Sequence, residues 1–512
     1  GKGPISTIAS SISNAAGELS QLPIVGEVAG TVSWISNLVS KVASIFGWSR
    51  PLSQQAVIPY ASIPGRGYTN AIGQDTSTLL GLDPENELTT DVEIFPSGVD
   101  EMDIAYVCAN QALALTFTWN KTAPILTPLA SLSVAPFPDN QIKFDDVQTF
   151  SSCPCDYVAS MFQFWRGTMC YRVCVANTAY HTGRLEISYI PGSFVKIGQN
   201  DDTTNTYRYI LDITNEAEVI IRIPFFSGSV MLPYYSTSTI DTLTVGTLTI
   251  RPITALHAPS VVADTVDVLV WKWMEDPVFA CPSTFQNTIY FPPAQPPPGK
   301  VSVDMQIMVG NVVDENKVVT FLDKDPGNEI VNTLSMVGGE AITNLRLLCR
   351  TFHNSGSYTL KSNVVKMISP YSGFLISDYL SWVGVLYRYA RGGLNYKFVA
   401  NNPNPGVFFS RLYIFKTTSA QGSTLVPSHM TNPAINPFHE ISIPFYSRYR
   451  KIPLFGGFNS NTGVIDPFEP LLPCVNISCT SDVGITELRS GKDDFSFGVL
   501  VGAPMTQNIM GI

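Results

Sequence analysis

Two segments of this chain occur twice, about 220 residues apart. The copies are residues 164–173 with 389–398, and residues 221–227 with 441–447. The first pair keeps an Arg-Gly sequence and a tyrosine followed by a base, and the second keeps Ile-x-Ile-Pro-Phe. The offsets are 225 residues (166 to 391) and 220 residues (224 to 444), which fit one tandem duplication. Solenoid repeats have periods of roughly 20–50 residues, so the repeated unit here is a whole domain. Two copies of one domain favour a building block over an enzyme with a single site.

The composition predicts at least two domains with extensive assembly contacts. A length of 512 residues exceeds what one hydrophobic core usually organises. Apolar residues make up 45% of the chain, whereas charged residues make up 14%, well below the typical quarter. We expect much of the surface to be buried against partners. A large β protein rich in Ser, Thr and Asn is the alternative explanation.

The charge balance does not suit a dedicated nucleic-acid binder. The net charge is −10, whereas such binders take their affinity from clustered Lys and Arg. The densest basic cluster is Arg448, Arg450 and Lys451, which is typical of a solvated loop. Any contact with RNA is therefore expected to be local or mediated by counterions.

Cysteine and histidine usage predicts neither a disulfide framework nor a metal site. The nine cysteines are an odd number and include no CxxC pair. The five histidines have no HxxxH or HExxH spacing, so we expect no metal and no cofactor. The thiols are expected to be reduced, as in the cytosol. We find no secretory signal and no run of eighteen apolar residues, so no membrane span is expected.

Residues 1–48 have the pattern of two amphipathic helices. Apolar side chains recur at helical spacing in each, opposite neutral faces rich in serine. The first stripe comprises Ile5, Ile8, Ile12, Ala15, Leu19 and Leu22, and the second comprises Val28, Val32, Ile35, Val39, Val42 and Phe46. A neutral polar face costs little to desolvate, so this segment is suited to a membrane interface. Two ordinary helices packed under a sheet are the alternative.

From Ser49 onward the pattern changes to strands and loops. The strand candidates are residues 168–176, 185–189, 242–250 and 265–273. Short helices are expected near residues 156–162 and 375–386, one before each Arg-Gly sequence. About eight strands per copy predict an all-β fold of two tandem sandwiches or jelly rolls. Five prolines within residues 292–299 predict a stiff linker between the copies.

Several short motifs together resemble the coat proteins of picorna-like viruses. They lie at residues 155–157, 164–167, 181–185 and 280–282 in the first copy, and at 336–340, 345–346, 491–498 and 502–504 in the second. Residues 45–51 are similar to the junction that follows a small internal capsid peptide. Within that group the chain looks most like the dicistroviruses of insects and the marnaviruses of marine algae. The resemblance covers essentially the whole chain.

The resemblance implies an architecture. Residues 1–48 would be the helical internal capsid peptide, 49–291 and 307–512 two eight-stranded antiparallel jelly-roll coat domains, and 292–306 a linker or cleavage region. Such non-enveloped, positive-strand RNA viruses build a quasi-threefold icosahedral shell from three jelly rolls, so a further coat protein is implied upstream. The other implied partners are encapsidated single-stranded RNA, a host receptor, and host membrane for the released peptide. The implied location is the virion, and the host cytoplasm during assembly.

Two other classes of protein remain open at this point. A carbohydrate-binding tandem β-sandwich would bind a glycan as a monomer or small oligomer, but it leaves the amphipathic segment unexplained. A cupin-like enzyme built on a double β domain would require clustered histidine ligands, which the sequence lacks.

The resemblance also implies one chemical step. In the dicistrovirus group an Asp-Asp-Phe motif is implicated in self-cleavage of the internal peptide, and Asp493-Asp494-Phe495 matches it. Two carboxylates with different protonation states would let one activate water while the other donates a proton. The alternative is that both begin the last strand and only accept backbone hydrogen bonds. The expected junctions are Trp48–Ser49 and, after the linker, Gln306–Ile307. No other enzymatic activity is expected.

Overall fold

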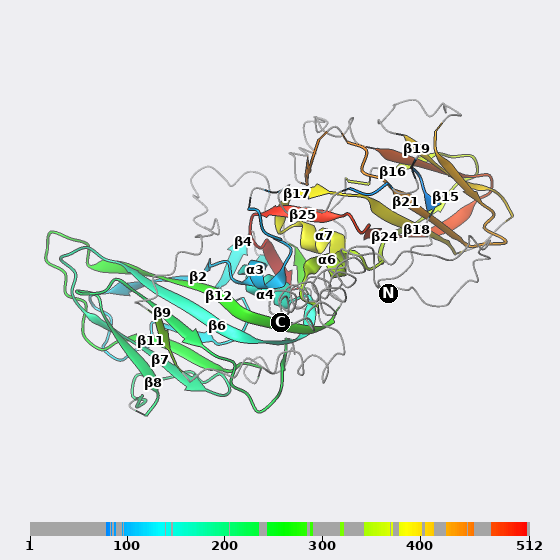
Figure 1. The fold of residues 1–512 in the computed structure, drawn as a ribbon. Coiled ribbons are helices and arrows are strands. Elements are labelled where there is room, and N and C mark those ends of the chain that lie inside the picture. The colour runs from blue at the N-terminus through cyan, green and yellow to red at the C-terminus, as the bar shows by residue number, and fades with distance from the viewer. Residues whose placement is uncertain are drawn as a thin grey trace, which may run out of the picture. The chain divides into compact units, whose positions relative to one another are not determined.

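The computed structural model describes most of both repeated regions (Figure 1). The described residues are 78–81, 83, 86–88, 95, 97–138, 140–144, 147–203, 205–234, 243–283, 287–289, 318–321, 342–368, 370–371, 378–401, 405–413, 426–447, 449–454 and 473–508. The expected amphipathic helices in residues 1–48 and the linker at 292–306 lie outside the described residues.

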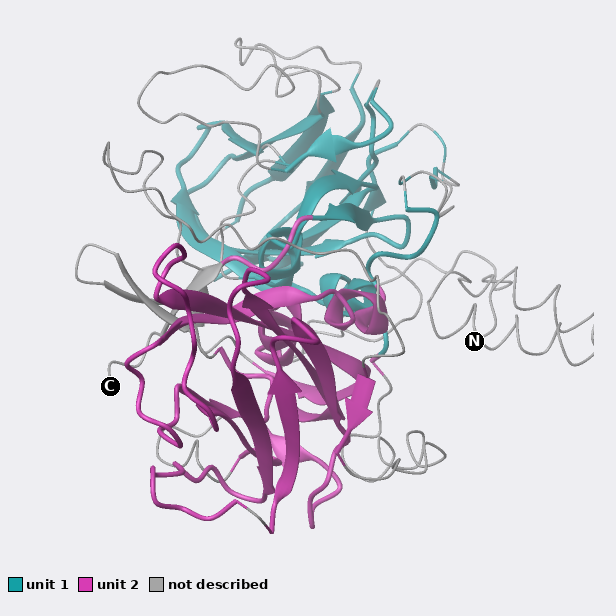
Figure 2. Ribbon diagram, turned by 90° about the vertical axis from the view of Figure 1, so that its left-hand side faces the viewer, with its two compact units in different colours: residues 1–102, 343–500 teal, residues 103–342, 501–512 magenta. Residues whose placement is uncertain are grey.

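The chain forms two compact units, and each contains sequence from both sides of the Pro-rich linker (Figure 2). Unit 1 comprises Gly1–Met102 and Thr343–Leu500, and unit 2 comprises Asp103–Ile342 and Val501–Ile512. The described part of 78–102 therefore belongs with the second copy of the repeat, although it precedes the first copy in the sequence. The bounds expected for the covalent domains stay a prediction.

Unit 2 contains two large sheets. The first has the strand order β14–β9–β6–β12–β2, with β10 paired to β6, and the second has the order β3–β11–β7–β8. The first comprises β2 (Ala112–Asn120), β6 (Phe162–Ala176), β9 (Glu218–Ile223), β10 (Leu232–Pro233), β12 (Thr265–Pro282) and β14 (Val318–Thr320). The second comprises β3 (Ala130–Ser133), β7 (Arg184–Pro191), β8 (Tyr207–Asp212) and β11 (Gly246–Pro252). A smaller sheet has the order β13–β26–β5–β4, from β4 (Asn140–Phe144), β5 (Val147–Ser151), β13 (Asn287–Ile289) and β26 (Met505–Asn508).

Burial along these strands follows the sequence pattern. In β12, Val266, Val268 and Val270 are buried while Thr265 and Asp267 are exposed, because alternate residues of a strand point to opposite faces. Every residue of β11 is buried. The expected strands at 168–176 and 185–189 are confirmed within β6 and β7, and those at 242–250 and 265–273 overlap β11 and β12. The core of the unit thus lies where the alternating pattern predicts it.

Unit 1 repeats this arrangement with shorter strands. Its sheets have the orders β1–β21–β18–β24–β15, β16–β23–β19–β20 and β22–β17–β25. The first comprises β1 (Thr78–Leu79), β15 (His353–Leu360), β18 (Leu394–Ala400), β21 (Phe438–Ile443) and β24 (Val483–Gly491). The second comprises β16 (Lys366–Ile368), β19 (Phe408–Tyr413), β20 (Ser428–Thr431) and β23 (Cys474–Cys479). The third comprises β17 (Tyr387–Arg391), β22 (Ile452–Pro453) and β25 (Ser496–Leu500). Strands β17 and β18 correspond to β6 of unit 2, and β24 and β25 correspond to β12, since their pairing partners match.

Each unit carries two short helices. They are α3 (Ile104–Cys108) and α4 (Pro154–Ala159) in unit 2, and α6 (Leu345–Cys349) and α7 (Tyr379–Gly384) in unit 1. The two expected helices are confirmed as α4 and α7, whereas α3 and α6 were not expected. Both of these have five residues, which is too short for a periodic apolar pattern, and their N-caps are Asp103 and Asn344.

A buried ion pair joins the second helix of each unit to its long strand. Asp156 of α4 lies 3.0 Å from Lys272 of β12, and Asp378, the N-cap of α7, pairs with Arg489 of β24. All four side chains are at most 2% exposed. An unpaired buried charge is costly, so each partner stabilises the fold only in the presence of the other.

A close approach of two strands explains the repeated glycine. Gly167 has φ 157° and Gly392 has φ 106°. A Cβ atom would lie 3.1 Å from the Asp276 carbonyl oxygen at Gly167, and 2.3 Å from the Asp494 carbonyl oxygen at Gly392. Each carbonyl belongs to an irregular stretch of the neighbouring strand, so both copies need a residue without a side chain here.

Some features are absent from the described part of the chain. No described helix is long and apolar enough to cross a membrane. The described residues hold no group of three or more His, Cys, Asp or Glu that is suited to a metal ion. All nine cysteines are described, and all are free thiols.

Candidate functional site

The Asp-Asp-Phe sequence lies in a turn of unit 1 between β24 and β25. The Lys492 N–H donates to the Gly393 carbonyl at 3.0 Å, and the Phe495 N–H donates to the Lys492 carbonyl at 3.0 Å. The expectation that the two aspartates begin the last strand is wrong, since β25 begins at Ser496. In a turn the two side chains do not have to alternate between the faces of a sheet.

Asp494 holds together three parts of the chain. Its side chain is buried, and Oδ1 accepts a hydrogen bond from the Gly393 N–H at 2.9 Å. Oδ2 accepts one from the Leu88 N–H at 3.1 Å. Burial lowers the pKa of Arg391, and the negative charge of Asp494 opposes that shift. Both carboxylate oxygens are thus engaged by backbone donors, which fixes the turn and the passing segment around Leu88.

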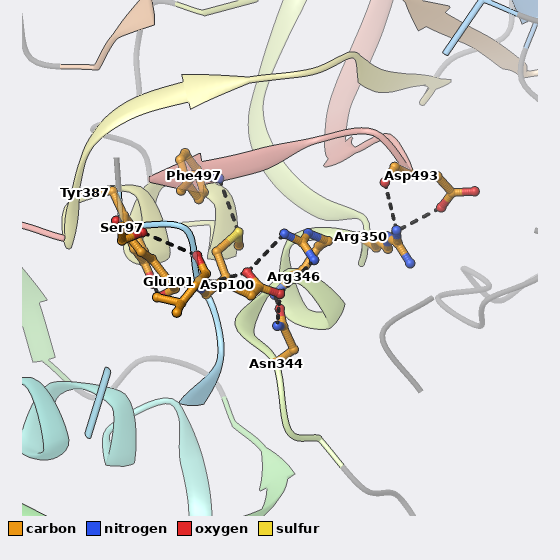
Figure 3. A network of polar contacts seen from close by, with 11 residues as sticks. Ser97, Asp100, Glu101, Asn344, Arg346, Arg350, Tyr387, Asp493 and Phe497 are labelled. Atoms are coloured by element: carbon orange, nitrogen blue, oxygen red, sulfur yellow. Dashed lines mark hydrogen bonds and ion pairs between the residues drawn. The ribbon is translucent and has the colours of Figure 1, made fainter. Parts of the chain in front are cut away.

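Asp493 is the more accessible of the two carboxylates. Its side chain is 32% exposed, and Arg350 Nε lies 3.4 Å from Oδ1. Arg350 Nη2 also donates to the Asp493 backbone carbonyl at 2.9 Å, and Figure 3 shows both contacts. Burial lowers the pKa of Arg350, and the charge of Asp493 opposes this shift. Arg350 therefore orients Asp493 without covering it.

Phe495 anchors the turn in the core. Its side chain is 1% exposed and packs edge to face on Phe497, with the ring centroids 4.8 Å apart. A Cβ atom on Gly491 would lie 3.1 Å from Phe495 Cβ, so the aromatic ring sits tightly over the end of β24. The role of Phe495 in this arrangement is to place the two aspartates.

A second polar network holds residues 97–102 against the same unit (Figure 3). Asp100 accepts two hydrogen bonds from Arg346, at 3.1 and 3.2 Å, and one from Asn344 at 2.9 Å. The Leu500 N–H donates to the Glu101 carboxylate at 2.8 Å. None of these contacts was predicted, because roughly 240 to 400 residues separate the partners. The nearest sequence signal was the Leu345-Arg346 pair that carried part of the resemblance.

The structure brings together three of the expected site residues and leaves four untested. Asp493, Asp494 and Phe495 form one turn. The expected junction residues Trp48, Ser49, Gln306 and Ile307 lie outside the described residues. The turn itself offers one fixed, buried carboxylate and one partly exposed carboxylate, which are different environments for proton exchange.

Two family models match this chain. Residues 1–48 match the model described as "Cricket paralysis virus, VP4", and residues 331–510 match the model described as "CRPV capsid protein like". The structural polyprotein of Acute bee paralysis virus (strain Rothamsted) is 34% identical over 99% of this chain and 61% of that polyprotein. The chain therefore spans about three fifths of the length of this relative.

Solved virus structures are also similar. A chain of the native virion of Kashmir bee virus at acidic pH is 36% identical, with a TM-score of 0.41, and the match covers 48% of this chain and 99% of that one. A chain of the Israel acute paralysis virus pentamer is 37% identical, with a TM-score of 0.41, over 50% of this chain and 100% of that one.

The chain belongs to the dicistrovirus-like structural polyproteins, as a capsid structural protein with a VP4 peptide in residues 1–48. It is a component of the virion capsid. The lectin-like and cupin-like alternatives find no support in these relationships.

Proposed function

We propose that this chain supplies two of the three jelly-roll coat domains of a quasi-threefold icosahedral shell. The observation that carries the proposal is the repeated pair of four-stranded orders. Strands β9–β6–β12–β2 and β3–β11–β7–β8 in unit 2 correspond to β21–β18–β24–β15 and β16–β23–β19–β20 in unit 1. Each unit thus offers eight strands in two sheets, which is the content of a viral jelly roll. The third position is taken by a further coat protein of the same polyprotein.

Assembly into pentamers and virions with that coat protein follows by similarity to the Israel acute paralysis virus pentamer and the Kashmir bee virus virion. Such a shell would enclose single-stranded RNA. Because the net charge of the chain is −10, contacts with RNA would be local or mediated by counterions.

Coexpression with the upstream coat region tests the assembly. Sedimentation and negative-stain microscopy should show pentamers or closed shells that contain both products. The chain expressed without the upstream region is the control and should form no closed shell. Only monomers or small oligomers in the coexpressed sample would contradict the proposal.

Maturation would release residues 1–48 by cleavage at Trp48–Ser49, and the released peptide would act on the host membrane through its amphipathic faces. Two contacts support a role of the Asp-Asp-Phe turn in this step. Asp494 accepts a hydrogen bond from Leu88, which lies only 39 residues after Ser49 in the sequence. Asp493 is partly exposed beside Arg350. Asp493 would take a proton from the water that attacks the Trp48 carbonyl carbon and return it to the leaving Ser49 amine, while Asp494 positions the segment.

Two isosteric variants separate these roles. Particles with Asp493→Asn should retain the uncut peptide, because the proton acceptor is lost. Particles with Asp494→Asn should release it more slowly, because one of its two backbone contacts is lost. Asp482→Asn, at an exposed ion pair with Lys361, is the matched control. Release at the normal rate from Asp493→Asn particles, followed on denaturing gels, would exclude the mechanism.

A further inference from the structure

Both units receive an added strand at the same place in the repeat. Strand β1 pairs in parallel with β21, and β14 pairs in parallel with β9. Each receiving strand is the Ile-x-Ile segment that precedes the repeated Pro-Phe. In the described chain, β1 and β14 stand at the ends of their sheets.

The register of the two additions is equivalent. Leu79 pairs with Ser442, and Thr320 pairs with Arg222, which is the residue 220 positions earlier and the counterpart of Ser442 in the repeat. The next residue of each added strand donates its N–H to the same carbonyl. The Leu80 N–H donates to Ser442 at 2.9 Å, and the Phe321 N–H donates to Arg222 at 3.0 Å.

The side chains at this position anchor the added strands. Leu80 is 1% exposed and Phe321 is 5% exposed. The Phe321 ring lies parallel to Tyr189, with centroids 6.2 Å apart and an interplanar angle of 4°. Main-chain hydrogen bonds combined with one buried side chain are the usual basis of strand addition to a sheet edge.

The sequence positions of the added strands make the exchange reciprocal. Strand β1 precedes the first copy of the repeat but lies in unit 1, whereas β14 precedes the second copy but lies in unit 2. Residues 86–102 continue in unit 1 through the contacts of Leu88 with Asp494 and of Asp100 with Arg346. Each N-terminal arm is thus held by the unit that contains the other copy of the repeat.

We propose that the repeated Ile-x-Ile-Pro-Phe strand is a receiving edge for an extended arm of the other coat domain. The exchange of the two arms would keep the two coat products associated after the chain is cut between them. This rests on the proposed function only in assuming that the linker is cut during maturation. The occupants are the segments around Leu80 and Phe321 of this same chain.

A cut introduced at a chosen site tests the proposal. A recognition sequence for a specific protease is inserted in the linker at residues 292–299, the purified chain is cut, and the products are separated by native size exclusion. They should elute together, at the volume of the uncut chain. Separation of the unmodified products would overturn the proposal.

Proline substitutions show whether the arms are responsible. Leu80→Pro with Phe321→Pro removes both donor N–H groups, and we expect the cut products to associate about tenfold more weakly for each arm lost. Leu79→Pro with Thr320→Pro is the matched control, since successive N–H groups of a strand point to opposite edges. Both pairs are also measured in a chain that ends at Leu500, because β26 is a third exchanged segment. Equal association of both pairs in either background would contradict the proposal.

Hydrogen exchange of the unmodified chain gives a readout that does not depend on any substitution. The amides of Leu80 and Phe321 should exchange at least about tenfold more slowly than those of Leu79 and Thr320. Equally fast exchange of all four amides would overturn the proposal. Both readouts are made in solution without shells, so failed assembly would contradict the shell and leave the exchange intact.

Discussion

At the scale of single residues, the two buried ion pairs make the sharpest stability prediction. Asp378→Ala should lower the free energy of unfolding of unit 1 by about 3–5 kcal/mol, because Arg489 is left buried without its partner. Asp482→Ala is the control, since Asp482 and Lys361 are both more than half exposed, and it should change little. Urea unfolding measures both. A loss for Asp378→Ala no larger than that of the control would contradict the role given to this pair.

Gly392 gives a second prediction at this scale. Gly392→Ala should cost at least about 1–3 kcal/mol of stability, because φ is 106° and the added Cβ would meet the Asp494 carbonyl. Gly484→Ala, where the nearest atom would lie at 3.7 Å, is the matched control in the same unit. Thermal unfolding compares the two variants, and an equal shift in Tm would show that the close approach is unimportant.

At the scale of elements, the packing of β19, β20 and β21 predicts a dependence on pH. His439 of β21 is buried, its two ring nitrogens contact Thr431 and Ser410 hydroxyls at 2.8 and 2.9 Å, and His429 lies beside it. Burial, and then the charge of His429, lower the pKa of His439 well below its usual 6.5. The unfolded chain therefore binds a proton that the folded unit does not. The contribution to stability is complete above about pH 6.5 and is lost progressively below it.

Urea unfolding of the chain at pH 7.5 and pH 5.5 measures this effect. Unit 1 should be less stable at pH 5.5, and His439→Gln should reduce the difference. His257→Gln, at an exposed histidine of unit 2, is the control and should leave the difference unchanged. Equal stability of unit 1 at both pH values would contradict the prediction.

The elements also show what the sequence could predict. Period-two alternation located β6 and β12, because one face of each strand is buried. The repeat located the corresponding strands of unit 1. The turn at Asp493 was placed in a strand instead, because a local pattern does not contain the contact between Gly392 and the Asp494 carbonyl. Likewise, no local signal connects Leu88 with Asp494, which lie 406 residues apart.

At the scale of the whole molecule, one duplicated domain accounts for both the scaffold and its assembly. The two units share their strand orders, their buried helix-to-strand ion pairs and their receiving edges. They differ at the Asp-Asp-Phe turn, where unit 2 has a bulge between Glu275 and Val278. The shared features suit quasi-equivalent positions in a shell, and the difference confines the proposed cleavage chemistry to unit 1.

The central claim is that both units of one chain occupy quasi-equivalent positions in one shell. Electron cryomicroscopy of particles made with the upstream coat region tests it most directly. The account predicts an icosahedral map in which units 1 and 2 fill two of the three positions around each quasi-threefold axis, with the upstream protein in the third. A map in which only one of the units lies in the shell wall would contradict it.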